Sequence, residues 1–143
     1  MIPLGDKAQS AQGIHDLRIV VVDDHDAVRR LIREILESED NWIVCGEAAD
    51  GVEAVERIRE LRPDLVVMDI IMPRRNGFEA TREIARMAPK IPVLMTTLYE
   101  FPELWRQVRD AGAQGCLLKT ESATSLIPAV KSLILRQTFF PVS

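Results

Sequence analysis

The sequence predicts an α/β fold: a (βα)5 doubly wound domain in which a five-stranded parallel sheet is covered by helices on both faces. Two observations support this prediction. Short apolar runs rich in branched side chains alternate five times with segments of helical periodicity, a pattern typical of βα repeats. The chain has 143 residues, a length that suits one domain with a core of its own.

Five short runs are the predicted strands, because strands buried on both faces are rich in branched apolar residues. They cover residues 18–22, 42–47, 65–69, 93–97 and 115–118. The segment after the first strand has the i, i+3, i+4, i+7, i+8 stripe of an amphipathic helix. Its members are Val28, Leu31, Ile32, Ile35 and Leu36. Three further helical stripes end at Pro63, Pro89 and Gly112, residue types that terminate helices.

The fifth helix contains Pro128, and a proline in a helix interior costs about 3 kcal/mol. A proline in the first turn costs much less, because its missing N–H has no partner there anyway. We therefore expect this helix to start late, with Thr124 near its N-cap and Pro128 in its first turn.

Composition excludes several classes of protein. The chain is 47% hydrophobic and 28% charged, so it is predicted to be globular and not disordered. A formal charge of −4 without a basic run argues against direct binding of nucleic acid. No apolar stretch approaches the roughly 20 residues of a membrane span, and the N-terminus has no signal-peptide pattern. Cys45 and Cys116 are expected to be reduced core residues of a cytoplasmic protein.

Carboxylates end two of the predicted strands. Asp23 and Asp24 follow the first strand, and Asp69 ends the third. In a sheet of order 2-1-3-4-5 these two strands flank the switch point, where ligands bind at the carboxyl ends of the strands. Clustered carboxylates suit a hard cation such as Mg²⁺. Thr97 at the end of the fourth strand and Lys119 after the fifth would converge on the same place.

Each of these residues also has an ordinary structural interpretation. Asp23 and Asp24 could cap a helix, and Asp69 could belong to a turn. Lys119 could be a solvated surface lysine, and Thr97 an ordinary strand residue. We interpret His25 as a solvent-facing loop residue and not as a metal ligand. Asn76-Gly77 is predicted to be the turn that starts the third helix.

Four motifs occur in order at these strand ends: V-V-D-D at 21–24, M-D-I-I-M-P-x-x-N-G at 68–77, P-V-L-M-T-T at 92–97 and D-A-G-A-Q-G-C-L-L-K at 110–119. Together they resemble the receiver domain of bacterial two-component response regulators, from residue 18 to about residue 136. The runs C-G-E-A-A-D-G-V-E-A-V and L-L-K-T resemble the NarL/LuxR-type subfamily most. The resemblance implies a flavodoxin-like receiver fold.

The resemblance also implies roles for single residues. Asp69 would be the phosphoacceptor. Asp24 and Asp69 would bind Mg²⁺ directly, Asp23 through water and Ile71 through its backbone carbonyl. Thr97 would donate its hydroxyl to the phosphoryl group, and Lys119 would pair with a phosphoryl oxygen.

One position departs from the family pattern. Most receivers carry Tyr or Phe three residues before the lysine, and this chain has Cys116 there. In the family that ring moves inward as the threonine moves toward the phosphoryl group, and a thiol cannot fill the same volume. We therefore expect the signal through Thr97 and Cys116 either to be weakened or to pass without an aromatic step.

The resemblance further implies partners and a domain plan. A sensor histidine kinase would be the phosphodonor, and the surface of helix four, strand five and helix five would change on phosphorylation. The resemblance allows a homodimer through that surface or through helices one and five, and DNA would be contacted only by an output domain absent here.

The chain is predicted to have three parts. Residues 1–16 would be a flexible leader, 17–136 the receiver domain, and 137–143 the start of a linker or a C-terminal tail. The receiver is either truncated or stand-alone.

Three other functions remain open on the sequence. The receiver fold could serve only for docking, without phosphorylation. An aspartate-nucleophile phosphohydrolase would need a second acid soon after Asp69, where Ile70 and Ile71 stand. A flavodoxin-like cofactor binder would need a phosphate loop after the first strand, and the acidic residues there would repel a phosphate. The prediction is thus a signalling module and not a turnover enzyme.

Overall fold

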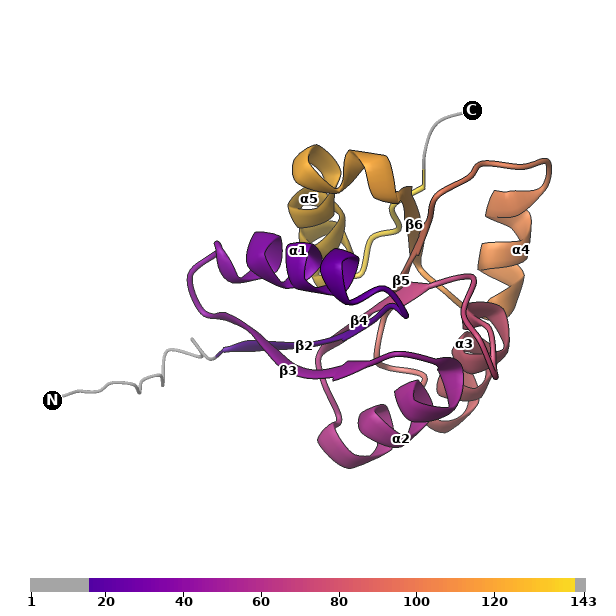
Figure 1. Ribbon diagram of the computed structural model, residues 1–143, viewed down its shortest axis with the longest axis horizontal. Helices are drawn as coiled ribbons and strands as arrows, with labels where there is room; N and C mark the ends of the chain where they lie inside the picture. Colours follow the sequence, from indigo (N-terminus) through magenta and orange to yellow (C-terminus); the bar gives the residue numbers. More distant parts are fainter. Residues whose placement is uncertain (1–15, 141–143) are drawn as a thin grey trace, which may run out of the picture.

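Five parallel strands form one sheet in the computed structural model, which describes residues 16–140 (Figure 1). The strands are β2 (Leu17–Val22), β3 (Trp42–Ala48), β4 (Leu65–Asp69), β5 (Val93–Thr97) and β6 (Gly115–Leu118). Their order across the sheet is β3-β2-β4-β5-β6. Counted along the described chain, this is the predicted order 2-1-3-4-5, and the predicted fold class is confirmed. Each predicted strand is found within one residue of its predicted bounds.

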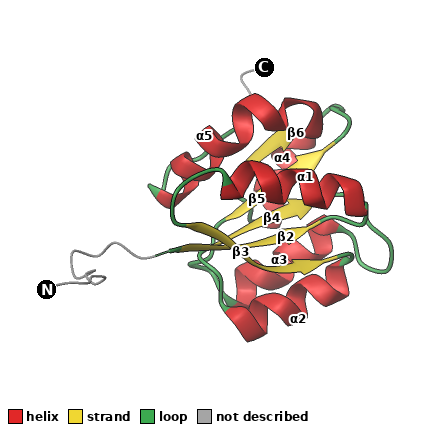
Figure 2. Ribbon diagram, turned by 60° about the vertical axis from the view of Figure 1, so that its left-hand side comes forward, coloured by secondary structure: helices red, strands yellow, loops and turns green. Residues whose placement is uncertain are grey.

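Helices cover both faces of this sheet, as Figure 2 shows. They are α1 (Asp26–Glu37), α2 (Gly51–Leu61), α3 (Gly77–Met87), α4 (Leu104–Ala111) and α5 (Ser122–Ile134), with the short 3₁₀ turn η1 (Lys119–Glu121) before α5. Side chains of β2 alternate between two apolar clusters: Ile19 packs with α1 and α5, and Val20 packs with α2, α3 and α4. The alternation follows from the two-residue period of a strand. The central strands are therefore buried on both sides.

The predicted apolar stripe of α1 is wrong at one position. Leu31 is 52% exposed, whereas Ile32 and Leu36 are fully buried against the sheet. Successive residues of a helix are about 100° apart, so a stripe centred on Ile32 and Leu36 turns Leu31 toward solvent. A single helix lying on a sheet buries a narrower stripe than the spacing alone suggested.

The predicted late start of the fifth helix is also wrong. α5 begins at Ser122, and Pro128 lies inside it with its ring exposed. Leu126, Val130 and Leu133 of this helix are buried in the cluster that α1 shares. Burial of a large side chain contributes about 2 kcal/mol, so three of them outweigh the one hydrogen bond that the proline removes.

The predicted terminal segments lie largely outside the described part of the chain. Of the predicted leader, only Asp16 is described, and of the predicted tail, residues 137–140. Within residues 16–140, no helix has the length and apolar character needed to cross a bilayer.

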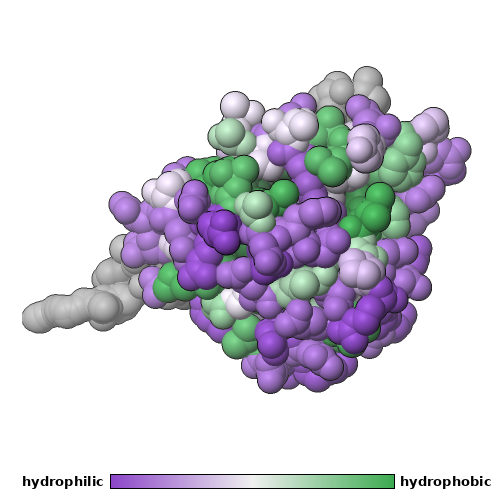
Figure 3. Space-filling model, in the orientation of Figure 1, coloured by the Kyte–Doolittle hydropathy of each residue, from purple (hydrophilic) through white to green (hydrophobic). Residues whose placement is uncertain are grey.

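The face shown in Figure 3 is mostly hydrophilic, with hydrophobic side chains in several small patches. Both cysteines are free; Cys116 is buried as predicted, and Cys45 is only partly buried.

Candidate functional site

The carboxyl ends of four neighbouring strands bring the predicted site residues together. Asp23 and Asp24 follow β2, and Asp69 is the last residue of β4. β5 lies beside β4, where Asp69 is in register with Thr96, so Thr97 falls at the same edge of the sheet. Lys119 begins the turn after β6. The structure thus gathers at one edge the residues that the sequence had placed there from strand ends alone.

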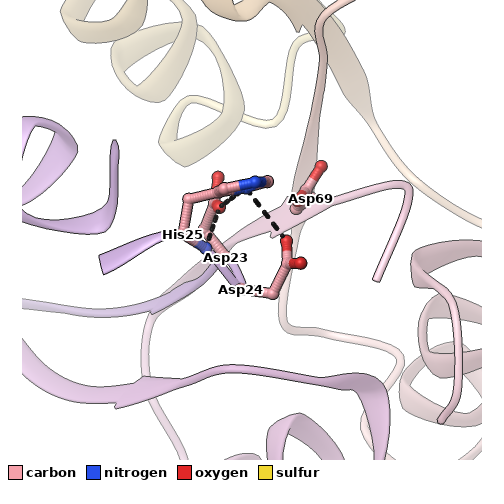
Figure 4. A group of neighbouring side chains, drawn as sticks. All are labelled: Asp23, Asp24, His25 and Asp69. Atoms are coloured by element: carbon pink, nitrogen blue, oxygen red, sulfur yellow. Dashed lines mark hydrogen bonds and ion pairs between the residues drawn. The ribbon is translucent and has the colours of Figure 1, made fainter. Parts of the chain in front are cut away.

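Four side chains at this edge form an acidic cluster (Figure 4). Asp23, Asp24, His25 and Asp69 each offer a ligand atom, and these atoms lie within 4.8 Å of one another. Asp23 and Asp69 are buried, and Asp24 is partly buried. Carboxylates at such separations repel one another, and the repulsion is strong where water is excluded. The cluster therefore needs positive charge.

Lys119 supplies part of that charge. Its Nζ lies 2.7 Å from Asp23 Oδ2 and 3.1 Å from Asp69 Oδ2, and the side chain is buried. Burial acts to lower the pKa of Lys119, but the two carboxylates outweigh burial and raise it. Burial, together with the charge of Asp23, raises the pKa of Asp69 to about 6, although Lys119 acts in the opposite direction. One lysine therefore does not fully compensate three acids.

The donor set fits a hard divalent cation. Asp24 Oδ1 is buried and accepts no hydrogen bond among the described residues, although His25 Nδ1 lies 3.3 Å away. A buried carboxylate oxygen without a partner is costly, and a bound cation would satisfy it. The cluster offers mainly carboxylate oxygens, which are the ligands that Mg²⁺ prefers. These residues are therefore compatible with the Mg²⁺ site that the sequence predicted.

His25 is exposed to solvent, as predicted from the sequence, but its ring also lies close to two of the acids. Its side chain is 63% exposed, as expected for a loop residue. Its Nδ1 nevertheless lies 3.5 Å from Asp23 Oδ1 and 3.3 Å from Asp24 Oδ1. The helix-cap interpretation of the acid pair is wrong, because His25 is the N-cap residue of α1 and no side chain caps this helix. Asp23 Oδ1 accepts a hydrogen bond from the His25 backbone N–H at 2.9 Å, one residue before the helix begins.

Thr97 reaches the site but directs its hydroxyl elsewhere. The side chain is buried, and Oγ1 donates to the Tyr99 carbonyl at 3.2 Å and accepts from the Tyr99 N–H at 3.3 Å. These hydrogen bonds hold the Thr97 hydroxyl against the loop after β5.

A surface pocket opens over the site; it is lined by His25, Asp69, Ile71, Thr97, Leu98, Tyr99 and Lys119. A small group approaching Asp69 would enter here.

Arg29 supports the backbone that carries the acid pair. Arg29 was missed by the sequence reasoning: its Nη1 donates to the backbone carbonyl of Asp23 at 2.7 Å, and its Nε donates to Glu47 at 2.7 Å. In the sequence, the only signal for this contact was a basic residue one turn into the helix that follows the acid pair.

Cys116 lies in the core, and burial raises the pKa of its thiol to about 12. It is therefore a packed apolar group and not a reactive thiol.

The loop between β4 and α3 is held tightly to the sheet. Asn76 caps α3 as predicted, and it exchanges hydrogen bonds with Glu79 in a capping box. The Gly77 N–H donates to the Ile70 carbonyl at 2.7 Å. Arg74 forms two bonds to Asp50 at the start of α2, at 2.9 and 3.0 Å. These contacts fix the segment that follows Asp69.

The chain is similar in sequence to known proteins. Residues 19–131 match the family described as response regulator receiver domain. Protein CcdB of Bacillus subtilis (strain 168) is 42% identical over 117 residues, which cover 82% of this chain and 97% of CcdB. Response regulator protein VraR of Staphylococcus aureus (strain Mu3 / ATCC 700698) is 38% identical over 125 residues, which cover 87% of this chain but only 59% of VraR.

A solved structure agrees in fold and in sequence. The crystal structure of a two-component response regulator of the LuxR family from Aurantimonas sp. SI85-9A1 superposes with a TM-score of 0.83 at 33% identity. The match covers 87% of this chain and 89% of that one. The subfamily suggested by the sequence motifs is thus found among the structural relatives.

Proposed function

This chain belongs to the response regulator receiver domain family, and from that premise we propose that it is a signalling switch in which Asp69 accepts a phosphoryl group from a sensor histidine kinase. The observation that carries the proposal is a buried aspartate that lies 3.1 Å from a buried lysine, at the floor of an open pocket. Members of the family act in general as signalling domains and not as turnover enzymes.

The proposed transfer uses the side chains already at the site. A carboxylate oxygen of Asp69 attacks the phosphorus in line, and the donor group leaves with the bonding electron pair. Lys119 moves its charge from the carboxylates to a phosphoryl oxygen. Thr97 donates its hydroxyl to a second phosphoryl oxygen, for which it must give up its bonds to the Tyr99 backbone.

Mg²⁺ is the proposed cofactor. Asp24 and Asp69 would hold it directly, Asp23 through water, and Ile71 through its backbone carbonyl. When bound, the ion neutralises the acidic cluster and the charge of the phosphoryl oxygens. Asp24 Oδ1, which accepts no hydrogen bond from the described part of the chain, supports this assignment. The family's use of an acidic pocket for Mg²⁺ supports it as well.

We expect Asp24→Asn to weaken Mg²⁺ binding by roughly tenfold or more, because the amide offers a neutral ligand in place of a charged one. Isothermal titration calorimetry with MgCl₂ measures the affinity. Asp110→Asn, at an exposed position of α4, is the matched control and should leave the affinity unchanged. Equal affinities for the two variants would remove Asp24 from the proposed ligand set.

The proposed partners follow from the family. The kinase would approach the open pocket, and phosphorylation would bias a two-state equilibrium of the α4–β6–α5 surface. That surface, or α1 with α5, would form any homodimer, and contact with DNA would be made by an output domain outside these 143 residues. The free thiols are compatible with a reducing, cytoplasmic compartment.

Acetyl phosphate, a small phosphodonor, tests the proposal without the kinase. We expect the protein to gain the mass of one phosphoryl group on incubation with acetyl phosphate and Mg²⁺, as measured by intact-mass spectrometry. Addition of EDTA should abolish the adduct. Absence of any adduct on a protein that demonstrably binds Mg²⁺ would contradict the proposal and favour the docking module without phosphorylation.

A further inference from the structure

The chain after α5 returns to the sheet and lies alongside β6, whose other edge pairs with β5 (Figure 1). Phe139 forms a parallel bridge with Gly115. Its N–H donates to the Gln114 carbonyl at 3.1 Å, and its carbonyl accepts from the Cys116 N–H at 2.9 Å. Residues 138–140 therefore occupy the hydrogen-bonding edge that β6 would otherwise leave open. We call this segment the edge strap.

The two aromatic residues of the edge strap pack on opposite sides of the sheet. Phe139 contacts the apolar cluster beneath α1 and α5, and Phe140 contacts the cluster beneath α2, α3 and α4. Neighbouring side chains of an extended segment point to opposite faces, so two consecutive phenylalanines bind both clusters at once. The guanidinium of Arg109, on α4, lies 4.1 Å from the centroid of the Phe140 ring. The edge strap thus links β6 to both helical layers.

Two local features make this close approach possible. A Cβ on Gly115 would lie 2.8 Å from the Phe139 carbonyl oxygen, so only glycine lets the edge strap reach β6 at this point. Arg136 has a φ of 64°, which reverses the chain after α5. Its N–H donates to the Leu133 carbonyl at 3.0 Å, and the Gln137 N–H donates to the Ser132 carbonyl at 2.9 Å. The turn is thereby built to return the chain to the sheet.

We propose that the edge strap opens locally: residues 138–140 detach from the edge of β6 while the rest of the domain stays folded. Because the strap occupies this hydrogen-bonding edge of β6, the edge becomes accessible only when the strap detaches. This inference does not depend on phosphorylation of Asp69.

Cys116 provides a probe for opening of the edge strap. It is fully buried in β6, and Cys45 is partly buried in β3, at the other end of the sheet order. Labelling with N-ethylmaleimide, read by peptide mass spectrometry, gives a separate rate for each thiol. Local opening of the edge strap exposes only Cys116, whereas global unfolding exposes both.

We expect Phe140→Ala to accelerate labelling of Cys116 by roughly tenfold while the rate at Cys45 stays within about twofold. Arg109→Gln, which removes only the cation over the ring, should accelerate Cys116 by a smaller factor. Leu135→Ala is the matched control, because Leu135 lies on the same C-terminal stretch but is 69% exposed. It should leave both rates unchanged.

Hydrogen exchange gives a second measurement on the same variants. The Cys116 amide, which donates to Phe139, should lose protection in Phe140→Ala, and the amides of β2 should keep theirs. Two results would overturn the proposal: Cys116 rates in Phe140→Ala equal to those of the Leu135→Ala control, or an equal acceleration at Cys116 and Cys45.

Discussion

We expect the Asp69→Asn variant to take up no phosphoryl group from acetyl phosphate under conditions in which the unmodified chain is labelled. The amide has nearly the shape of the carboxylate, but its nitrogen and carbonyl oxygen are poor nucleophiles. Intact-mass spectrometry over a time course measures the adduct. Asp110→Asn, an exposed substitution of the same chemistry, should label at the normal rate. Full labelling of Asp69→Asn would place the phosphoacceptor elsewhere.

The same variant should keep its fold, and its stability should depend less on pH. The pKa of Asp69 is about 6 in the folded chain, above its ordinary value of 3.8. Ionisation of Asp69 therefore opposes folding as the pH rises from about 4 to about 6. Urea unfolding without Mg²⁺ should show this loss of stability in the unmodified chain, and a smaller loss in Asp69→Asn. An unchanged pH dependence would contradict the raised pKa.

We expect Gly77→Ala to destabilise the fold by about 3 kcal/mol, since overpacking against rigid backbone costs this order of free energy. A Cβ at this position would lie 2.2 Å from the Asp69 carbonyl oxygen and 2.8 Å from the Ile70 Cα. Alanine is otherwise the better helix former by about 1 kcal/mol, so without that clash the substitution would stabilise α3. Urea unfolding measures the free energy of unfolding.

Gly46→Ala is the matched control for this prediction. A Cβ at Gly46 would also come close to a neighbour, at 2.5 Å, but that neighbour is the terminal methyl group Cδ1 of Leu61. A leucine side chain can rotate aside, whereas the backbone of Asp69 is held by its strand. The control should therefore lose less than about 1 kcal/mol. A Gly77→Ala variant as stable as the unmodified chain would show that the loop after Asp69 is free to move.

Much of the fold could be predicted because it depends on local patterns. Branched apolar runs marked the strands, helical stripes marked the helices, and Asn76-Gly77 marked the start of α3. Errors arose where packing overrode a local rule. Leu31 was assigned to a buried stripe that is narrower than its spacing implied, and Pro128 lies inside α5 because burial of that helix outweighs the cost of the proline.

Some features of the site could likewise be predicted from the sequence, and others could not. That Asp23, Asp69 and Lys119 would meet followed from the order of strands and the position of each residue at a strand end. The bond of Lys119 to Asp23 as well as to Asp69 did not follow, because it depends on the depth at which the lysine is buried. Nor did the attachment of the Thr97 hydroxyl to the Tyr99 backbone, which is a property of the loop conformation.

The sequence by itself determined the fold class, the strand ends that carry the acids, and the identity of the residues expected to do the chemistry. It could do so because periodicity and strand ends are read within a few neighbouring residues. Only the tertiary structure decided the support of Asp23 by Arg29, the approach of His25 to the acids, and the return of Phe139 to β6. The last of these joins residues far apart along the chain, so it depends on how α5 packs against the sheet. The other two join residues close in sequence and depend on the backbone conformation between β2 and α1, which periodicity does not specify.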